Sequence, residues 1–118
     1  MTDRFDEVRQ KLLQFRDERD WAEYHDPKDL AEAVSIESGE LLENFLWKTV
    51  ADSRRLDDAE VQSIGQEIAD IFIYLIYLSE ELDLDLIEET TKKLKINEKR
   101  FPVEIERQSD SRTQKVKK

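Results

Sequence analysis

Apolar residues recur every three or four positions through most of this chain, and this spacing is typical of amphipathic helices. Phe5, Val8, Leu12 and Phe15 show it in the first segment. The chain of 118 residues contains only two glycines and two prolines, so long helices with short connections are expected. The pattern predicts an all-α fold of four helices, over residues 3–19, 27–50, 58–82 and 85–100.

Local signals support these boundaries. Asp26 followed by Pro27 is typical of a helix start, and Asp57 with Glu60 resembles a capping box. The length and the position of Pro102 predict one domain over residues 1–102, followed by a polar, mobile tail over 103–118. The third segment is apolar almost all round, so we expect it to be central or to lie in a subunit interface that completes a thin core.

Composition excludes several classes of protein. The chain has no cysteine, which rules out disulfides and thiolate metal sites. Its net charge of −10 disfavours binding to DNA or RNA, because the phosphate backbone would be repelled. No apolar run is long enough to span a bilayer and no signal peptide is visible, so we expect a cytoplasmic protein without a membrane partner.

Four carboxylates form two short motifs, Glu37-x-x-Glu40 and Glu67-x-x-Asp70. Residues at i and i+3 share one face of a helix, so each motif places two carboxylates together. Glu37 and Glu67 fall inside the apolar stripes of their helices, whereas Glu40 and Asp70 lie at the edges. Burying a carboxylate is costly, and a counter-ion is therefore expected.

Mg²⁺ suits such a cluster, because it prefers carboxylate oxygens and leaves coordination positions open to substrate phosphates. His25 is the single histidine, and no Glu-x-x-His pair exists, which argues against di-iron and zinc sites. Either motif alone is common on a solvated helix face. Two motifs centred on the apolar stripes of adjacent helices favour a Mg²⁺ site, and with it an enzyme that acts on a phosphorylated substrate.

These motifs carry a resemblance to a known family. Glu37-Ser-Gly-Glu40-Leu-Leu-Glu43, then Phe45-Leu-Trp47-Lys48, and Glu67-Ile-Ala-Asp70 resemble the all-α MazG-like nucleotide pyrophosphohydrolases. Lys93, Asn97 and Arg100, followed by Phe101 and Pro102, are similar to the downstream signature of that family, although Phe101 stands where tyrosine is common. The stretch from Trp21 to Leu30 is similar to the dCTP pyrophosphatase branch.

The resemblance implies a four-helix fold, dimeric or tetrameric, that hydrolyses a nucleoside triphosphate to the monophosphate and pyrophosphate with Mg²⁺. It implies that Glu37, Glu40, Glu67 and Asp70 are the metal ligands and catalytic residues. It also implies substrate-binding residues for the phosphates, the base and the sugar, with those for the phosphates coming from the same or from a neighbouring subunit. These residues are Lys93, Asn97 and Arg100 for the phosphates, Trp21 and Trp47 for the base, and His25 near the sugar or phosphates.

The substrate expected first is a deoxynucleoside triphosphate resembling dCTP, removed as part of nucleotide-pool house-cleaning. Two alternatives remain open. One is a non-catalytic helical interaction protein in which the carboxylates are surface charges. The other is a relative that acts on a different nucleotide, such as dUTP or phosphoribosyl-ATP.

Overall fold

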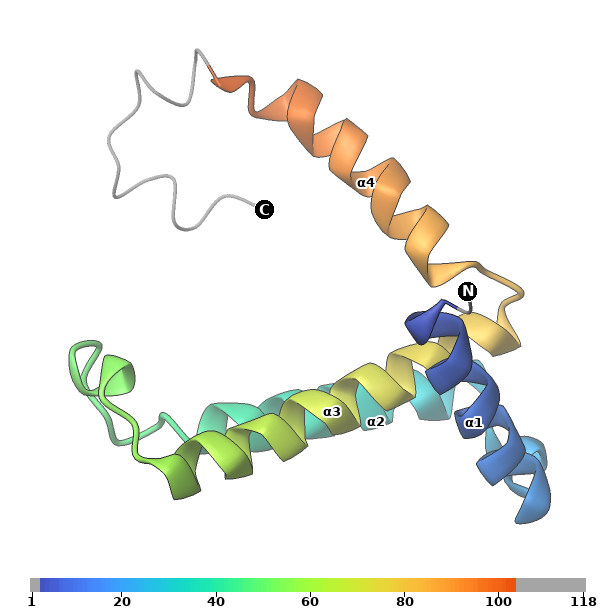
Figure 1. Cartoon of the computed structure of the whole chain (residues 1–118), viewed down its shortest axis with the longest axis horizontal. Helices are drawn as coiled ribbons and strands as arrows, with labels where there is room; N and C mark the ends of the chain where they lie inside the picture. The colour runs from blue at the N-terminus through green and yellow to red at the C-terminus, as the bar shows by residue number, and fades with distance from the viewer. Residues whose placement is uncertain (1–2, 104–118) are drawn as a thin grey trace. The chain divides into compact units, whose positions relative to one another are not determined.

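A computed structural model describes residues 3–103 of the chain and confirms the all-α prediction (Figure 1). It contains four α-helices, two short 3₁₀ segments and, within those residues, no strand. The elements are α1 (Arg4–Glu18), η1 (Trp21–Tyr24), α2 (Pro27–Glu43), η2 (Asp52–Arg54), α3 (Asp58–Glu81) and α4 (Leu86–Arg100). None of the helices in the described part is long and apolar enough to cross a membrane.

The chain divides into two compact units, Met1–Asp83 with α1, α2 and α3, and Leu84–Lys118 with α4. The predicted boundary at residue 102 stays a prediction, and nearly all of the predicted tail, residues 104–118, lies outside the described residues.

Aspartates begin three of the four α-helices with side-chain caps. Asp3 and Asp85 each accept a hydrogen bond from a backbone N–H of the first turn. The predicted capping box at α3 is confirmed, since Asp57 accepts from the Glu60 N–H at 2.8 Å and Glu60 accepts from the Asp57 N–H at 3.2 Å. These caps satisfy N–H groups that have no partner inside the helix. All four predicted starts agree with the structure to within a residue, and these caps account for three of them.

The predicted end of the second helix at Val50 is wrong, because α2 ends at Glu43. Asn44 terminates it by donating its side-chain amide to the carbonyls of Glu40 and Leu41, at 3.2 and 3.4 Å. These bonds satisfy carbonyls that the next helical turn would otherwise use. Residues 45–57 therefore form a loop that contains η2, and Trp47 lies in that loop rather than at the end of a helix.

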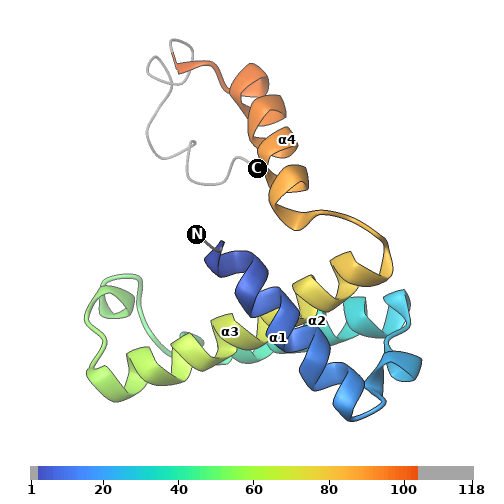
Figure 2. The same ribbon diagram turned by 45° about the vertical axis from the view of Figure 1, so that its right-hand side comes forward.

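Helices α2 and α3 lie side by side and antiparallel, and α1 packs across the C-terminal half of α3 (Figures 1 and 2). Ile64, Ile76 and Tyr77 of α3 are buried, as is Leu30 of α2. The Tyr77 hydroxyl donates to the Leu12 carbonyl at 2.9 Å and so ties α3 to α1. Burial of three of its side chains agrees with a central third helix, one of the two predicted alternatives, and the subunit interface stays a prediction.

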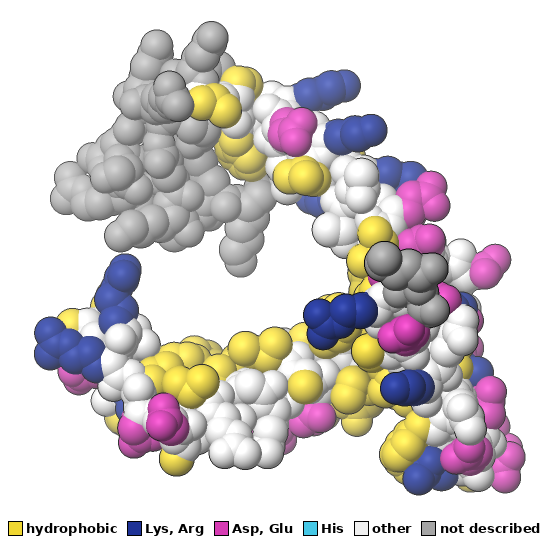
Figure 3. Space-filling model, in the orientation of Figure 1, with side chains coloured by type: hydrophobic (Ala, Val, Ile, Leu, Met, Phe, Trp, Pro, Cys, Tyr) yellow, Lys and Arg dark blue, Asp and Glu magenta, His cyan; other side chains and the backbone are white. Residues whose placement is uncertain are grey.

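The α2–α3 hairpin also keeps many apolar side chains exposed, and Figure 3 shows hydrophobic groups gathered along it. The exposed side chains include Ile36 and Leu42 on α2, and Val61, Ile68 and Phe72 on α3. In the loop that joins α2 to α3, Trp47 is 93% exposed and Val50 is 80% exposed. Large contiguous apolar surface on a small protein typically marks a contact with another molecule.

Both glycines lie inside these two helices, Gly39 in α2 and Gly65 in α3. A Cβ atom added to either would meet no heavy atom within 4 Å. Packing within the described part of the chain therefore does not require glycine at these positions.

Candidate functional site

Three carboxylates converge between α2 and α3. Glu37, Glu67 and Asp70 each offer an oxygen, and these oxygens lie within 4.8 Å of one another. Glu37 and Glu67 are half-buried and Asp70 is exposed, as their positions in the apolar stripes predict. One oxygen of Glu37 and one of Glu67, both Oε2, are buried and have no hydrogen-bond partner among the described residues.

Such a cluster is electrostatically unfavourable without a cation. Burial raises the pKa of the Glu37 carboxyl to about 7. The adjacent carboxyls of Glu67 and Glu40 act in the same direction, as does the negative charge of Asp70. Buried polar atoms normally have partners, so the two unpartnered oxygens are suited to receive a positively charged ligand.

The donor set fits a hard divalent cation. All three side chains offer carboxylate oxygens, and within residues 3–103 no histidine or cysteine joins them. Oxygen-only coordination is typical of Mg²⁺, Ca²⁺ and Mn²⁺ rather than zinc. The cluster could therefore hold a divalent metal ion.

Glu40 lies beside this group rather than within it. It lines an open pocket of about 410 Å³ together with Glu43, Asn44, Ser63 and Glu67. Because Glu67 belongs to both, the pocket adjoins the carboxylate cluster. Asn44 and Ser63 were missed by sequence reasoning, although each stands four residues from a predicted ligand in the direction of the loop.

The predicted base-binding and sugar-binding residues differ in their surroundings. Trp21 is partly exposed and makes an edge-to-face contact with Phe15, with ring centroids 5.4 Å apart. Trp47 is almost fully exposed. His25 is buried, its ring lies 4.6 Å from that of Tyr77, and its Nδ1 has no partner in residues 3–103.

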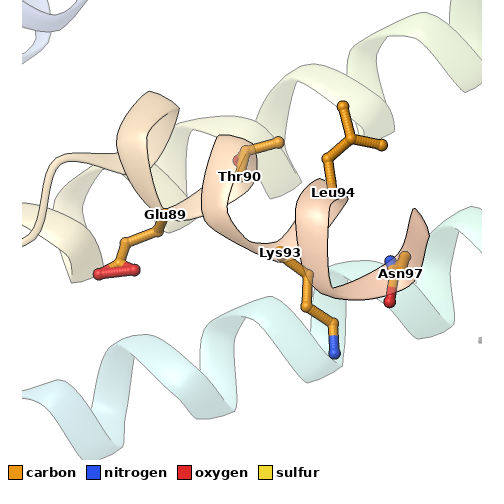
Figure 4. A pocket seen from close by; sticks show the side chains of 5 residues that line it. All are labelled: Glu89, Thr90, Lys93, Leu94 and Asn97. Carbon is orange, nitrogen blue, oxygen red and sulfur yellow. The ribbon is translucent and has the colours of Figure 1, made fainter. Parts of the chain in front are cut away.

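The three predicted phosphate-binding residues belong to α4. Lys93 and Asn97 line a pocket of about 390 Å³ with Glu89, Thr90 and Leu94 (Figure 4). The Oδ1 atom of Asn97 is buried without a hydrogen-bond partner in the described part of the chain. The Arg100 guanidinium lies over the Phe101 ring, 5.1 Å from its centroid. Lys93 and Asn97 thus share one surface of α4, as their i, i+4 spacing predicts.

Comparison with known proteins places this arrangement in a family. The model of the MazG-like family matches residues 33–116, which include both carboxylate motifs and all of α4. This chain belongs to the MazG-like family. The family resemblance seen in the sequence is thereby confirmed.

The relatives of this MazG-like chain carry the names of pyrophosphatases. It is 33% identical over 106 residues to dCTP pyrophosphatase 1 of Rattus norvegicus and to that of Homo sapiens. The match covers 88% of this chain but 62% of either relative, so the chain spans about three fifths of their length. The crystal structure of a pyrophosphatase from Archaeoglobus fulgidus superposes with a TM-score of 0.81 at 35% identity, covering 86% of this chain and 95% of that one.

Proposed function

We propose that the protein is a Mg²⁺-dependent hydrolase that converts a nucleoside triphosphate to the monophosphate and pyrophosphate, with a dCTP-like deoxynucleotide as the first candidate substrate. The observation that carries this proposal is the pair of buried, unpartnered oxygens of Glu37 and Glu67 beside Asp70. Membership of the MazG-like family and the names of the relatives support the same reaction.

Glu37, Glu67 and Asp70 would hold the metal, with Glu40 completing the ligand set from the adjoining pocket. Bound Mg²⁺ would neutralise phosphate charge and lower the pKa of an attacking water. Glu40 is exposed and lines that open pocket, so the oxygen of its carboxylate that does not bind the metal is the candidate acceptor for the proton of the water.

Other side chains would bind the organic part and the phosphates. The exposed ring of Trp47 and the partly exposed ring of Trp21 offer stacking surfaces for a base. Lys93, Asn97 and Arg100 supply cations and an amide on α4 for the phosphates. His25 would act indirectly, because its ring is buried against Tyr77.

A panel of nucleoside and deoxynucleoside triphosphates, assayed with Mg²⁺, tests the reaction. We expect equimolar monophosphate and pyrophosphate, fastest turnover with dCTP, and a loss of at least about a hundredfold when EDTA removes the metal. Steady release of orthophosphate, or turnover that EDTA leaves unchanged, would contradict the proposal. Faster turnover of dUTP would correct the substrate and leave the reaction class intact.

The alternative of a non-catalytic interaction protein predicts a different result. A ligand that binds the folded state raises the melting temperature. We therefore expect Mg²⁺ with a nonhydrolysable dCTP analogue to stabilise the protein. No thermal shift, together with no hydrolysis of any nucleotide in the panel, would favour the interaction protein.

We also propose that the protein is a homo-oligomer, a dimer or a tetramer, joined through the apolar side chains that the α2–α3 hairpin exposes. Ile36, Leu42, Ile68 and Phe72 are all more than two fifths exposed, which is costly for a small helical domain in water. Sedimentation equilibrium is expected to give at least twice the chain mass of 14.1 kDa. Phe72→Glu should shift the distribution toward monomer, whereas a wild-type monomer at micromolar concentration would refute an oligomer.

A further inference from the structure

A neutral hydrogen bond crosses from the end of α2 to α3 beside the carboxylates. The Ser63 hydroxyl donates to the Oδ1 atom of Asn44 at 3.2 Å. The Nδ2 atom of Asn44 donates to the carbonyls of Glu40 and Leu41. Asn44 is half-buried, and its side chain is thus fixed at both its oxygen and its nitrogen.

The bond lies one helical turn from the proposed metal ligands on both helices. Asn44 follows Glu40 by four residues, and Ser63 precedes Glu67 by four. Since α2 and α3 are antiparallel, these spacings stack the Asn44–Ser63 pair directly on the layer formed by Glu40 and Glu67. All four side chains line the same pocket.

The position matters because negative charge in the cluster opposes close approach of the two helices. Like charges in a small volume repel, and no cation of the described residues pairs with Glu37, Glu67 or Asp70. Beyond the Asn44–Ser63 bond, the loop residue Lys48 forms an ion pair with Glu60 of α3. The loop end of the hairpin is therefore closed by two successive cross-links, of which the neutral one borders the cluster.

We propose that Asn44 and Ser63 form a positioning pair, which holds α2 and α3 at the separation that metal binding by Glu37, Glu40, Glu67 and Asp70 requires. The inference rests on the proposed function, since it assumes that the cluster binds a cation. A neutral pair suits this task because it joins the helices without placing another charge beside the ligands. The Oδ1 atom of Asn44 bonds to α3 and its Nδ2 atom bonds to α2. The Asn44 side chain therefore fixes both the end of α2 and the distance between α2 and α3.

The test measures Mn²⁺ affinity directly, by electron paramagnetic resonance of the free ion, in the full-length protein. Ser63→Ala and Asn44→Ala are each expected to weaken Mn²⁺ binding about three- to tenfold, at or below the range known for groups bonded directly to metal ligands. The double variant should lose little more than Asn44→Ala alone, because both changes break one interaction. At subsaturating Mg²⁺, the rate of hydrolysis should fall in proportion to the loss of metal affinity.

Ser79→Ala is the matched control. Ser79 also lies in α3, but its hydroxyl donates to the Leu75 carbonyl of its own helix, so Mn²⁺ affinity should not change. Ser63→Ala keeps the test decisive, because alanine favours the helix and circular dichroism should show a folded protein. If folded Ser63→Ala and Asn44→Ala bind Mn²⁺ as tightly as the wild type, the positioning role is wrong. If the wild type itself binds no Mn²⁺, the proposed metal site fails first.

Discussion

Replacing Glu67 by glutamine is expected to lower pyrophosphate release by at least about a hundredfold while leaving the helical content unchanged. Glu67 belongs to both the carboxylate cluster and the adjoining pocket, so no other proposed ligand has so central a place. Removal of one group that stabilises charge in a transition state commonly costs a factor of about 10² to 10³. Initial rates with Mg²⁺ and dCTP, with circular dichroism at 222 nm, provide the measurement.

The same substitution should not destabilise the protein without metal. Glutamine is similar in size and removes one negative charge from the cluster, so the melting temperature in EDTA should stay equal or rise. Glu32→Gln is the control, because Glu32 is exposed on α2 outside the proposed site and should keep full activity. Wild-type rates in a folded Glu67→Gln variant would remove the cluster from the proposed mechanism.

In the absence of metal, Glu37→Gln is expected to be more stable than the wild type by an amount that grows with pH. The folded state raises the pKa of Glu37 from 4.5 to about 7, chiefly through burial. The wild type therefore keeps the stability of the protonated carboxyl below pH 4.5 and loses it as the pH rises through 7. Glutamine has no proton to lose, so the melting temperatures should differ by several degrees at pH 8 and converge near pH 4.5.

The variant must be compared with the wild type because His25 changes the stability with pH in the opposite direction. Burial lowers the pKa of His25, with Arg16 adding to the effect and Glu81 opposing it. The unfolded chain then binds the His25 proton more readily, and stability rises with pH up to about 6.5. This contribution is common to both proteins and cancels in their difference. A difference that stays constant from pH 5 to pH 8 in EDTA would contradict the raised pKa of Glu37.

Much of the fold could be predicted because its signals are local. Asp57 and Glu60 stand three residues apart and cap α3 through bonds within one turn, so the sequence alone contains that interaction. The placement of Glu37 and Glu67 between helices likewise follows from their positions in the apolar stripes. Helical period determines which face a residue occupies, whatever the rest of the chain does.

The interactions that could not be predicted join residues far apart in the sequence. The early end of α2 depends on the Asn44 amide, which competes with further helical turns and is fixed in turn by Ser63 of another helix. The burial of His25 depends on its contact with Tyr77, 52 positions later in the chain. Such contacts are selected by tertiary packing, and periodicity carries no information about them.

The positions of the two glycines have a consequence for how the hairpin folds. Glycine within a helix costs about 1 kcal/mol relative to alanine, and neither Gly39 nor Gly65 is required by neighbouring atoms of the described chain. Each helix that carries the carboxylates therefore has a lower intrinsic helix propensity than it would have with alanine at that position, and packing provides most of the stability of helices in proteins. The contact between α2 and α3 therefore contributes to the order of both helices. Glu37 lies on α2 and Glu67 on α3, so unfolding of either helix would separate the two halves of the proposed metal site.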